Sequence, residues 1–308
     1  MSVLVTGAGG FIGASLVSYL VEQGHEVVAL DRSLDMCLKG DQVIPVEGDL
    51  TQDATISEAF AHNVSAIVHL AALPGGAAET DPELSFSVNV EGAWKLLRRA
   101  ARIKSGIRFV YASTIAVFGE PLPTDGLTDS TPVNPRMIYG MHKAMVEMAV
   151  SSMARRGELD AIGLRLPGIV ARPTGASGLK SAFMSDIFHA LQRHETIELP
   201  VSQDAQMWMM TVANAVDCLV SAISLDSVVL PEDRIVTLPA LRVRMGDLVA
   251  EIARQTGADP SIVTYAPDVT LEAAFGNYPL LSTPAADAAG FRHDGDLARL
   301  VQRALAPR

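Results

Sequence analysis

The first half of the sequence alternates short apolar runs with longer stretches of helical periodicity. The apolar runs show little alternation between apolar and polar positions, which is typical of strands covered on both faces. Strands that alternate with helices indicate a parallel sheet between two helical layers. The predicted strands are Ser2–Thr6, Glu26–Asp31, Gln42–Glu47, Ala66–Leu70, Arg108–Ser113 and Ile162–Leu166. The predicted helices are Ile12–Gln23, Thr55–His62, Glu83–Lys104 and Met137–Arg156.

After residue 166 the pattern is shorter and less regular. Residues 172–181 are rich in Gly, Ser, Thr and Pro, which predicts a loop. The predicted helices that follow are Phe183–Arg193, Val212–Ser224, Met245–Thr256 and Leu297–Leu305, and the predicted strands are Ile197–Leu199 and Arg234–Leu238.

Composition excludes several classes of protein. Apolar residues make up 49% and charged residues 19% of the chain, which excludes intrinsic disorder. The net charge of −11 repels phosphate, so neither nucleic acid nor an anionic membrane is an expected partner. With only two cysteines, Cys37 and Cys218, we expect no disulfide scaffold, no metal site and a reducing, cytoplasmic location.

The uncharged start, residues 1–21, contains four glycines and no basic segment, so it predicts strand, loop and helix rather than a signal peptide or membrane span. Gly7, Gly10 and Gly13 lie between this strand and helix. Glycines here permit a tight turn and let a pyrophosphate approach the helix N-terminus. Such a turn can also be purely structural, but its place at the start of an alternating sheet favours a dinucleotide site. The predicted NAD contacts in this loop are Gly7, Gly10, Phe11, Ile12 and Gly13.

An acidic residue, Asp31, ends the second predicted strand, where a carboxylate can hold the adenosine ribose hydroxyls. Arg32 follows it, so the 2′-phosphate of NADP is not wholly excluded. The Asp31 carboxylate repels that phosphate, which favours NAD. These features predict a Rossmann-type doubly wound parallel sheet with a smaller C-terminal substrate-binding domain. We expect the NAD-binding domain over residues 1–166 plus about 205–238, and the substrate domain over about 167–204 and 239–308.

Two further segments are expected to border the same cofactor. Asp49 and Leu50 follow the third strand, where the carboxylate can accept from the adenine amino group. Leu70, Ala71 and Ala72 close the fourth strand with small side chains that leave room for the cofactor ribose. Each segment alone is an ordinary turn, but their order and spacing support one another.

A tyrosine and a lysine four residues apart, Tyr139 and Lys143, share one face of a predicted helix. A neighbouring ammonium lowers the pKa of a phenol from about 10 toward neutrality, which makes it a usable acid or base. Ser113 and Thr114 end the fifth strand and can hold a substrate oxygen. His142 is rotated about 100° from Lys143 on the helix, so we expect it to be exposed.

Together these motifs resemble the extended short-chain dehydrogenases/reductases of the NAD-dependent epimerase/dehydratase group, over essentially the whole chain. The resemblance implies that Thr114 is the catalytic hydroxyl, Tyr139 the acid/base and Lys143 its partner. It also implies a homodimer formed through the helices corresponding to 83–104 and 137–156. It further implies that Lys143 contacts the nicotinamide ribose, and the remaining cofactor contacts that we expect are Asn89, Ser113, Tyr139 and Pro167.

The departures from this group point to the substrate. Ile115 and Ala116 stand where nucleotide-sugar dehydratases carry an acidic pair, and residues 206–209 lack the arginine that grips a sugar nucleotide's diphosphate. The segments around 115–119 and 208–210 resemble instead an NAD-dependent branch that oxidises C2 of a small sugar acid of the D-erythronate type. The expected substrate contacts are Pro74, Gly75, Thr114, Tyr139, Arg172 and Lys180.

Three alternatives stay open at this stage. Arg172 is equally interpreted as a cation that holds the substrate carboxylate or as a surface arginine after a strand. The chain as a whole can also be read as a nucleotide-sugar epimerase or as a non-catalytic NAD-binding sensor. Sensors of this kind often lose the tyrosine or the lysine, and Tyr139 and Lys143 are both present.

Overall fold

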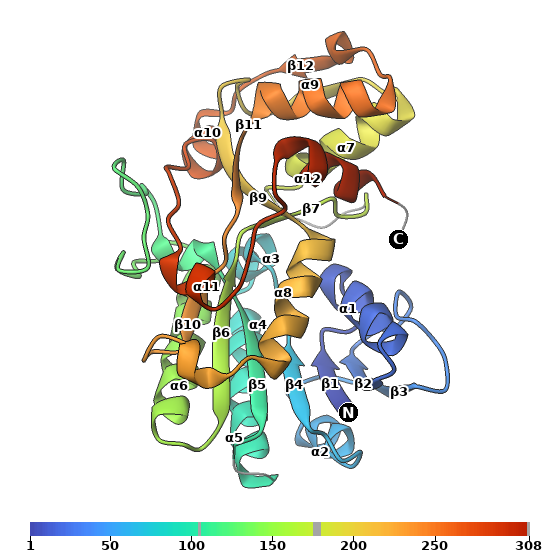
Figure 1. Cartoon of the computed structure of the whole chain (residues 1–308), viewed down its shortest axis with the longest axis vertical. Helices are drawn as coiled ribbons and strands as arrows, with labels where there is room; N and C mark the ends of the chain where they lie inside the picture. The colour runs from blue at the N-terminus through green and yellow to red at the C-terminus, as the bar shows by residue number, and fades with distance from the viewer. Residues whose placement is uncertain (104–105, 175–179, 307–308) are drawn as a thin grey trace.

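A computed structural model describes residues 1–103, 106–174 and 180–306 (Figure 1). Position 104, predicted to end a helix, and positions 175–179 of the predicted loop lie outside the described residues. The larger lobe contains strands β1 (Ser2–Thr6), β2 (Glu26–Asp31), β3 (Val43–Glu47), β4 (Ala66–His69), β5 (Arg108–Thr114), β6 (Asp160–Leu166) and β10 (Ile235–Thr237). Its helices are α1 (Phe11–Glu22), α2 (Asp53–Ala59), α3 (Gly75–Thr80), α4 (Pro82–Phe86), α5 (Ala93–Ile103), α6 (Ile138–Arg155), α8 (Val212–Ser224) and α11 (Pro284–Ala288).

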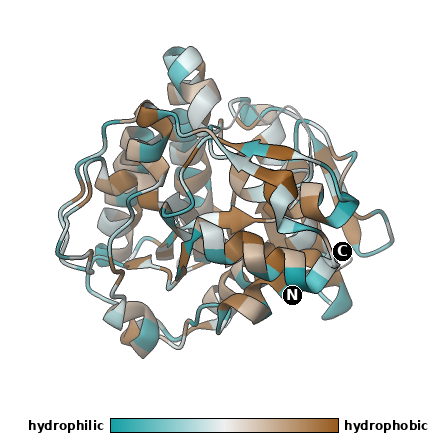
Figure 2. Cartoon of the chain, turned by 90° about the horizontal axis from the view of Figure 1, so that it is seen from above, coloured by the Kyte–Doolittle hydropathy of each residue, from teal (hydrophilic) through white to brown (hydrophobic). Residues whose placement is uncertain are grey.

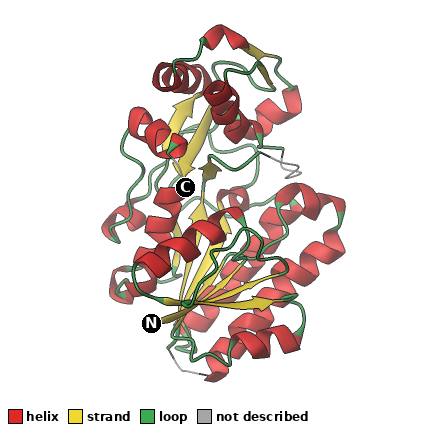
Figure 3. Cartoon of the chain, turned by 90° about the vertical axis from the view of Figure 1, so that its right-hand side faces the viewer, coloured by secondary structure: helices red, strands yellow, loops and turns green. Residues whose placement is uncertain are grey.

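The strands of the larger lobe form one parallel seven-stranded sheet in the order β10-β6-β5-β4-β1-β2-β3. Successive residues of β1 enter different cores, because side chains alternate across a strand. Val3 and Val5 pack under α1 and α8, whereas Leu4 packs under α2, α5 and α6. Figure 3 shows these layers from the side. The predicted doubly wound α/β fold is therefore confirmed, and the six strands predicted for the first half agree within two residues at each end.

The smaller lobe stands above the carboxyl ends of these strands (Figure 1). It contains a three-stranded sheet in the order β11-β9-β7 and a two-stranded sheet of β12 and β8 around their own apolar core. The strands are β7 (Gly168–Val170), β8 (Ile197–Leu199), β9 (Gln206–Thr211), β11 (Leu241–Arg244) and β12 (Val263–Tyr265), and the helices are α7 (Phe183–Arg193), α9 (Met245–Thr256), α10 (Val269–Phe275) and α12 (Leu297–Leu305).

The chain crosses between the two lobes at more points than the predicted domain boundaries include. Strand β9 lies within the range assigned to the NAD-binding domain but pairs with β7 and β11. Near the other end of the chain, Ala286 and Phe291 return to the core beside α1 and α8. The domain boundaries therefore stay a proposal. Figure 2 shows hydrophilic residues on outer helices and in outer loops alike. None of the described helices combines the length and apolarity that a membrane crossing requires.

The predicted helix over 83–104 has three parts, α4, a π-helical segment at Ser87–Gly92 and α5. Asp81 begins it, since its carboxylate accepts a hydrogen bond from the Leu84 backbone N–H. The wider π turn places Asn89 in the interior of the protein, against the segment that follows β4. This segment borders the site described next.

Candidate active site

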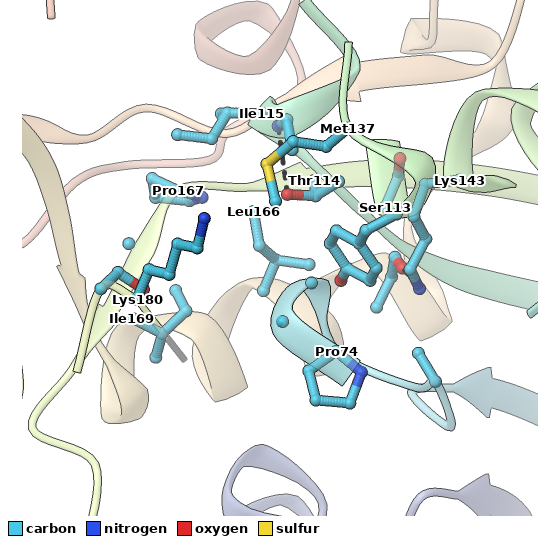
Figure 4. A pocket seen from close by; sticks show the side chains of 18 of the residues that line it. Pro74, Ser113, Thr114, Ile115, Met137, Lys143, Leu166, Pro167, Ile169 and Lys180 are labelled. Carbon is cyan, nitrogen blue, oxygen red and sulfur yellow. Dashed lines mark hydrogen bonds between the residues drawn. The ribbon is translucent and has the colours of Figure 1, made fainter. Parts of the chain in front are cut away.

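A cavity of about 410 Å³ lies at the carboxyl ends of β1, β4, β5 and β6, between the two lobes. Figure 4 shows the side chains that enter it from several segments. Ligands in open parallel α/β sheets bind outside the carboxyl ends of the strands, so its position agrees with the fold. The predicted site residues that line it are Gly7, Gly10, Phe11, Ile12, Gly13, Leu70, Ala72, Pro74, Gly75, Ser113, Thr114, Tyr139, Lys143, Pro167, Arg172 and Lys180.

The glycine loop forms a cradle of bare backbone. Gly7 has a φ of +73°, and a Cβ there would lie 2.7 Å from the Ala71 nitrogen. A Cβ on Gly13 would lie 2.0 Å from the Gly7 carbonyl oxygen. Helix α1 starts at Phe11 after Gly10, and no described side chain caps it. The loop therefore presents the positive end of a helix, without a side chain in the way, to the pyrophosphate of a dinucleotide.

Asp31 fixes this loop to the second strand. One carboxylate oxygen accepts from the Gly9 backbone N–H at 3.0 Å, and the other accepts from the Arg32 N–H at 2.6 Å. The Arg32 side chain is exposed. Asp31 therefore supports the backbone of the loop that a cofactor would contact. A direct contact between Asp31 and the adenosine ribose stays a proposal.

Some predicted cofactor residues have structural contacts of their own. Asp49 accepts from the Thr51 backbone N–H at 2.8 Å, and Leu50 is buried in the core. The Asn89 amide donates to the Leu73 carbonyl at 3.0 Å and accepts from the Leu73 N–H at 2.7 Å. Asn89 thus holds the cavity wall after β4 from behind. The predicted site residues outside the cavity lining are Asp31, Arg32, Asp49, Leu50, Ala71 and Asn89.

Thr114, Tyr139 and Lys143 meet in the cavity, as Figure 4 shows for the threonine and the lysine. Thr114 ends β5, and its hydroxyl oxygen accepts from the Ala116 backbone N–H at 3.2 Å, which leaves the hydroxyl proton available for a ligand. The Lys143 ammonium donates to the Ala112 carbonyl at 2.7 Å and lies 5.7 Å from the centroid of the Tyr139 ring. A phenol, a hydroxyl and an amine are thereby brought to one cavity.

The electrostatics of this group differ from the sequence-based expectation. Burial raises the pKa of Tyr139 to about 12, and the nearby Arg172 only partly opposes this effect. Burial also lowers the pKa of Lys143 to about 7, against the opposing influence of Glu147. The expectation that the lysine brings the phenol toward neutrality is therefore wrong for the protein alone, because removal from water outweighs the neighbouring charge.

A buried ion pair lies directly behind Lys143. Glu147, on α6, receives two hydrogen bonds from the Arg165 guanidinium, at 2.9 and 2.7 Å, and one from the Ser113 hydroxyl at 2.5 Å. The Ser113 proton is thus committed to Glu147 rather than to a ligand. Sequence reasoning missed this group, although Glu147 follows Lys143 at helical spacing and Arg165 interrupts an apolar strand.

The expectation that His142 is exposed is wrong. Its ring is buried, with Nδ1 2.9 Å from the Ser85 hydroxyl oxygen and its plane edge-on to Phe86 at 5.6 Å. Helix α4 packs against this side of α6, so a residue that points away from Lys143 still meets protein. Burial lowers the pKa of His142.

Sequence reasoning also missed several residues of the cavity wall opposite Ser113 and Lys143. The Arg172 guanidinium lies 5.4 Å from the centroid of the Phe11 ring, and Lys180 enters from the opposite side to Ser113 and Lys143 (Figure 4). Trp208 donates from its indole to the Pro279 carbonyl at 2.9 Å. The additional lining residues with charged or aromatic side chains are Glu79, Glu120, Arg136, Trp208, Phe275 and Tyr278.

A doubly wound sheet with a glycine loop, a Tyr–Lys pair and a strand-end hydroxyl defines an NAD-binding enzyme of the oxidoreductase type. Residues 3–234 match the NAD dependent epimerase/dehydratase family, and the chain belongs to that family. The predicted family, an NAD-dependent enzyme of the dehydrogenase class, and NAD as its cofactor are confirmed.

Several relatives extend over nearly the whole chain. D-erythronate dehydrogenase from Cupriavidus necator is 30% identical, covering 98% of this chain and 97% of its own length. D-erythronate dehydrogenase from Haemophilus influenzae is 27% identical and covers 98% of each chain. Among solved structures, a nucleoside-diphosphate-sugar epimerase from Agrobacterium tumefaciens matches with a TM-score of 0.88 at 25% identity, covering 98% of this chain and 92% of that one.

Proposed function

We propose that the protein oxidises the C2 hydroxyl of a small sugar acid, of the D-erythronate type, to the 2-oxo acid with NAD. The observation that carries this proposal is the meeting of Thr114, Tyr139 and Lys143 beside the glycine loop in one cavity. The two D-erythronate dehydrogenases that align over the whole chain support the substrate class.

In this reaction each residue has a separate role. Thr114 donates its hydroxyl proton to the substrate oxygen and holds it toward Tyr139. The Tyr139 phenolate accepts the C2 hydroxyl proton as the carbonyl forms, and the Lys143 ammonium stabilises the phenolate. Bound NAD would supply the acceptor for the hydride that leaves C2, together with a positive charge in the cavity. The proton on Tyr139 then returns to solvent, so the products are the 2-oxo acid, NADH and a proton.

The substrate carboxylate requires a cation or several donors. Arg172 is the proposed partner, because it lines the cavity and its charge acts on Tyr139, whose target hydroxyl lies on the carbon next to the carboxylate. Lys180 is a second proposed contact. Pro74 and Gly75, at the start of α3, form the proposed floor of the substrate site.

The first test is NADH absorbance with purified protein, NAD and a panel of C4–C6 aldonates. We expect steady NADH formation with D-erythronate or a close stereoisomer. If only a longer aldonate yields NADH, the proposed oxidation stands and the assigned substrate changes. No NADH across the panel, despite NAD binding, would refute the proposed dehydrogenase.

A nucleotide-sugar epimerase is the second candidate, and the solved Agrobacterium structure favours it. An epimerase regenerates its cofactor in each cycle, so it produces no steady NADH. In this chain the stretch Gln206–Met209 forms buried strand β9 and contributes no cation to the cavity. The same assay with UDP- and dTDP-sugars, read by product epimerisation, separates the two candidates.

We also propose a homodimer through the outer faces of α4, α5 and α6. Leu84, Phe86, Trp94, Met141, Met145 and Met148 expose apolar side chains there, with Met148 74% exposed. Exposed large apolar side chains on helices that pack against one another indicate an interaction surface. A second copy is the proposed occupant because the resemblance to this group implies a homodimer through the corresponding helices.

The substitution Met148→Glu is expected to reduce the molecular mass in solution from that of two chains to that of one chain. A carboxylate at the centre of an apolar interface would be buried without a partner, which weakens association strongly. Light scattering coupled to size exclusion measures the mass. Val269→Glu is the matched control, since Val269 is 85% exposed on α10 in the smaller lobe. A wild-type protein that already runs as a single chain would refute the proposed dimer.

A cytoplasmic location is proposed as well. Cys37 and Cys218 are both buried and unpaired, in keeping with a reducing compartment.

A further inference from the structure

The cavity contains two glutamates, and their surroundings differ. Glu79 lies on α3, and its carboxylate accepts from the Ile138 backbone N–H at 2.7 Å, so it caps α6. Glu120 is half-buried, and within the described part of the chain its carboxylate has no hydrogen bond and no ion pair. Because no described side chain or backbone N–H donates to this half-buried carboxylate, its oxygens keep their acceptor capacity for water or for a bound ligand.

The backbone fixes Glu120 at this position. It follows Thr114 by one 3₁₀ turn, Ile115–Phe118, and a glycine. Gly119 has a φ of +72°, and a Cβ there would lie 1.8 Å from the Asn134 carbonyl oxygen. Asn134 in turn donates from its backbone N–H to the Val117 carbonyl at 2.9 Å. The segment that carries Glu120 is therefore tightly held, and the carboxylate belongs to the cavity wall.

The charges of the cavity act on two different places. Arg172 acts on Tyr139, where the reacting hydroxyl and the adjacent substrate carboxylate are proposed to bind. Glu120 acts on Tyr278, which comes from the smaller lobe at the aromatic wall. Burial raises the pKa of Glu120, and the charges of Arg136 and Lys180 only partly oppose this effect. Arg172 thus acts at Tyr139 and Glu120 acts at the aromatic wall, where Lys180 and Arg136 also act on Glu120.

We propose that Glu120 determines specificity by accepting hydrogen bonds from the distal hydroxyl groups of the substrate and by repelling a second carboxylate at that position. This inference rests on the proposed oxidation of a sugar acid and narrows its substrate class to polyhydroxy monocarboxylates. An ionised carboxylate accepts from hydroxyl donors strongly and has no donor of its own, so the second carboxylate of a four-carbon dicarboxylate meets a like charge at this position.

The test compares D-erythronate with tartrate, which carries a carboxylate in place of the terminal CH₂OH group. Glu120→Gln is expected to lower kcat/KM for D-erythronate roughly tenfold to hundredfold, mainly through KM, and to narrow the preference over tartrate at least about tenfold. Glu79→Gln removes a charge from the same cavity but keeps an acceptor for Ile138, so it should not alter the preference. A preference within twofold of wild type in Glu120→Gln would overturn the proposal.

A binding measurement separates this inference from the proposed reaction. D-Erythronate, tartrate and L-threonine are titrated calorimetrically into wild type and Glu120→Gln, each saturated with NAD in a Tyr139→Phe background. Weaker D-erythronate binding in Glu120→Gln supports the role of Glu120 even if no aldonate yields NADH. Glu120-dependent binding of L-threonine alone would show that the donor is an ammonium group and would overturn the hydroxyl assignment, as would equal D-erythronate binding by both proteins.

Discussion

Replacing Tyr139 with phenylalanine is expected to reduce kcat for sugar-acid oxidation by about 10²–10⁴-fold, the range that general acid–base catalysis contributes. The substitution removes one oxygen and leaves the ring that lies against Lys143 in place. The glycine loop is untouched, so NAD affinity should stay within about threefold of wild type. Steady-state NADH formation and calorimetric NAD titration measure the two effects. Residual activity above a tenth of wild type would exclude Tyr139 as the base.

The pH dependence of wild-type oxidation gives an independent check of the same residue. The reaction requires the ionised phenol, and burial raises the pKa of Tyr139 to about 12 in the protein alone. Below that pKa the phenolate fraction rises with pH, whereas the Lys143 ammonium, whose pKa burial lowers to about 7, is lost as pH rises. We therefore expect kcat/KM to rise up to about pH 7 and to level off above it, where the two changes cancel. A continued rise above pH 7 would show that the reaction does not require the Lys143 ammonium. Tyr265→Phe, on β12 in the smaller lobe, is the control for loss of a tyrosine hydroxyl elsewhere.

The larger lobe could be predicted from sequence because its signals are local. Each strand of the first half is a single apolar run, and both faces of each run meet helices, so one-dimensional pattern and three-dimensional burial coincide. The Tyr139–Lys143 spacing is likewise local to one helix. In the smaller lobe, β7 and β11 are three and four residues long and gain their identity from pairing with β9. Such pairing over long sequence separation leaves no periodic signal.

The errors at the site arise from contacts between distant segments. His142 is buried by α4, which precedes it by more than fifty residues, and helical geometry within α6 cannot reveal that neighbour. The pKa of Tyr139 depends on how completely both lobes exclude water, which a spacing motif does not encode. No sequence pattern indicated Glu120 as a site residue, because its proposed role depends on the absence of a hydrogen-bond partner among the described residues. A sequence pattern shows which groups are present, whereas their surroundings decide what each group does.

The second large effect is expected from Glu147→Gln, which breaks the buried ion pair behind the site. The Glu147 and Arg165 side chains are only 5% and 9% exposed, and Arg165 also lies 4.8 Å from the centroid of the Phe118 ring. The substitution keeps the volume but leaves the guanidinium buried without a counter-charge. Removing one partner of such a pair lowers the free energy of unfolding by about 3–5 kcal/mol. For a chain of this size, the thermal midpoint should fall by roughly 10 °C.

Two further variants identify the cause of that loss. Glu195→Gln makes the same substitution in an ion pair with Arg193 whose side chains are about half exposed, and it should change stability by less than about 1 kcal/mol. The double variant Glu147→Leu with Arg165→Met removes both charges and should recover much of the stability, since an apolar pair of similar volume replaces a buried salt bridge at little cost. A double variant as unstable as Glu147→Gln would contradict the attribution of the loss to the unpaired guanidinium charge. In the double variant the Ser113 hydroxyl loses its acceptor, Glu147. Because Ser113 precedes Thr114 at the end of β5, this loss should disturb the orientation of Thr114 toward the substrate. We therefore expect the double variant to recover stability without recovering full kcat.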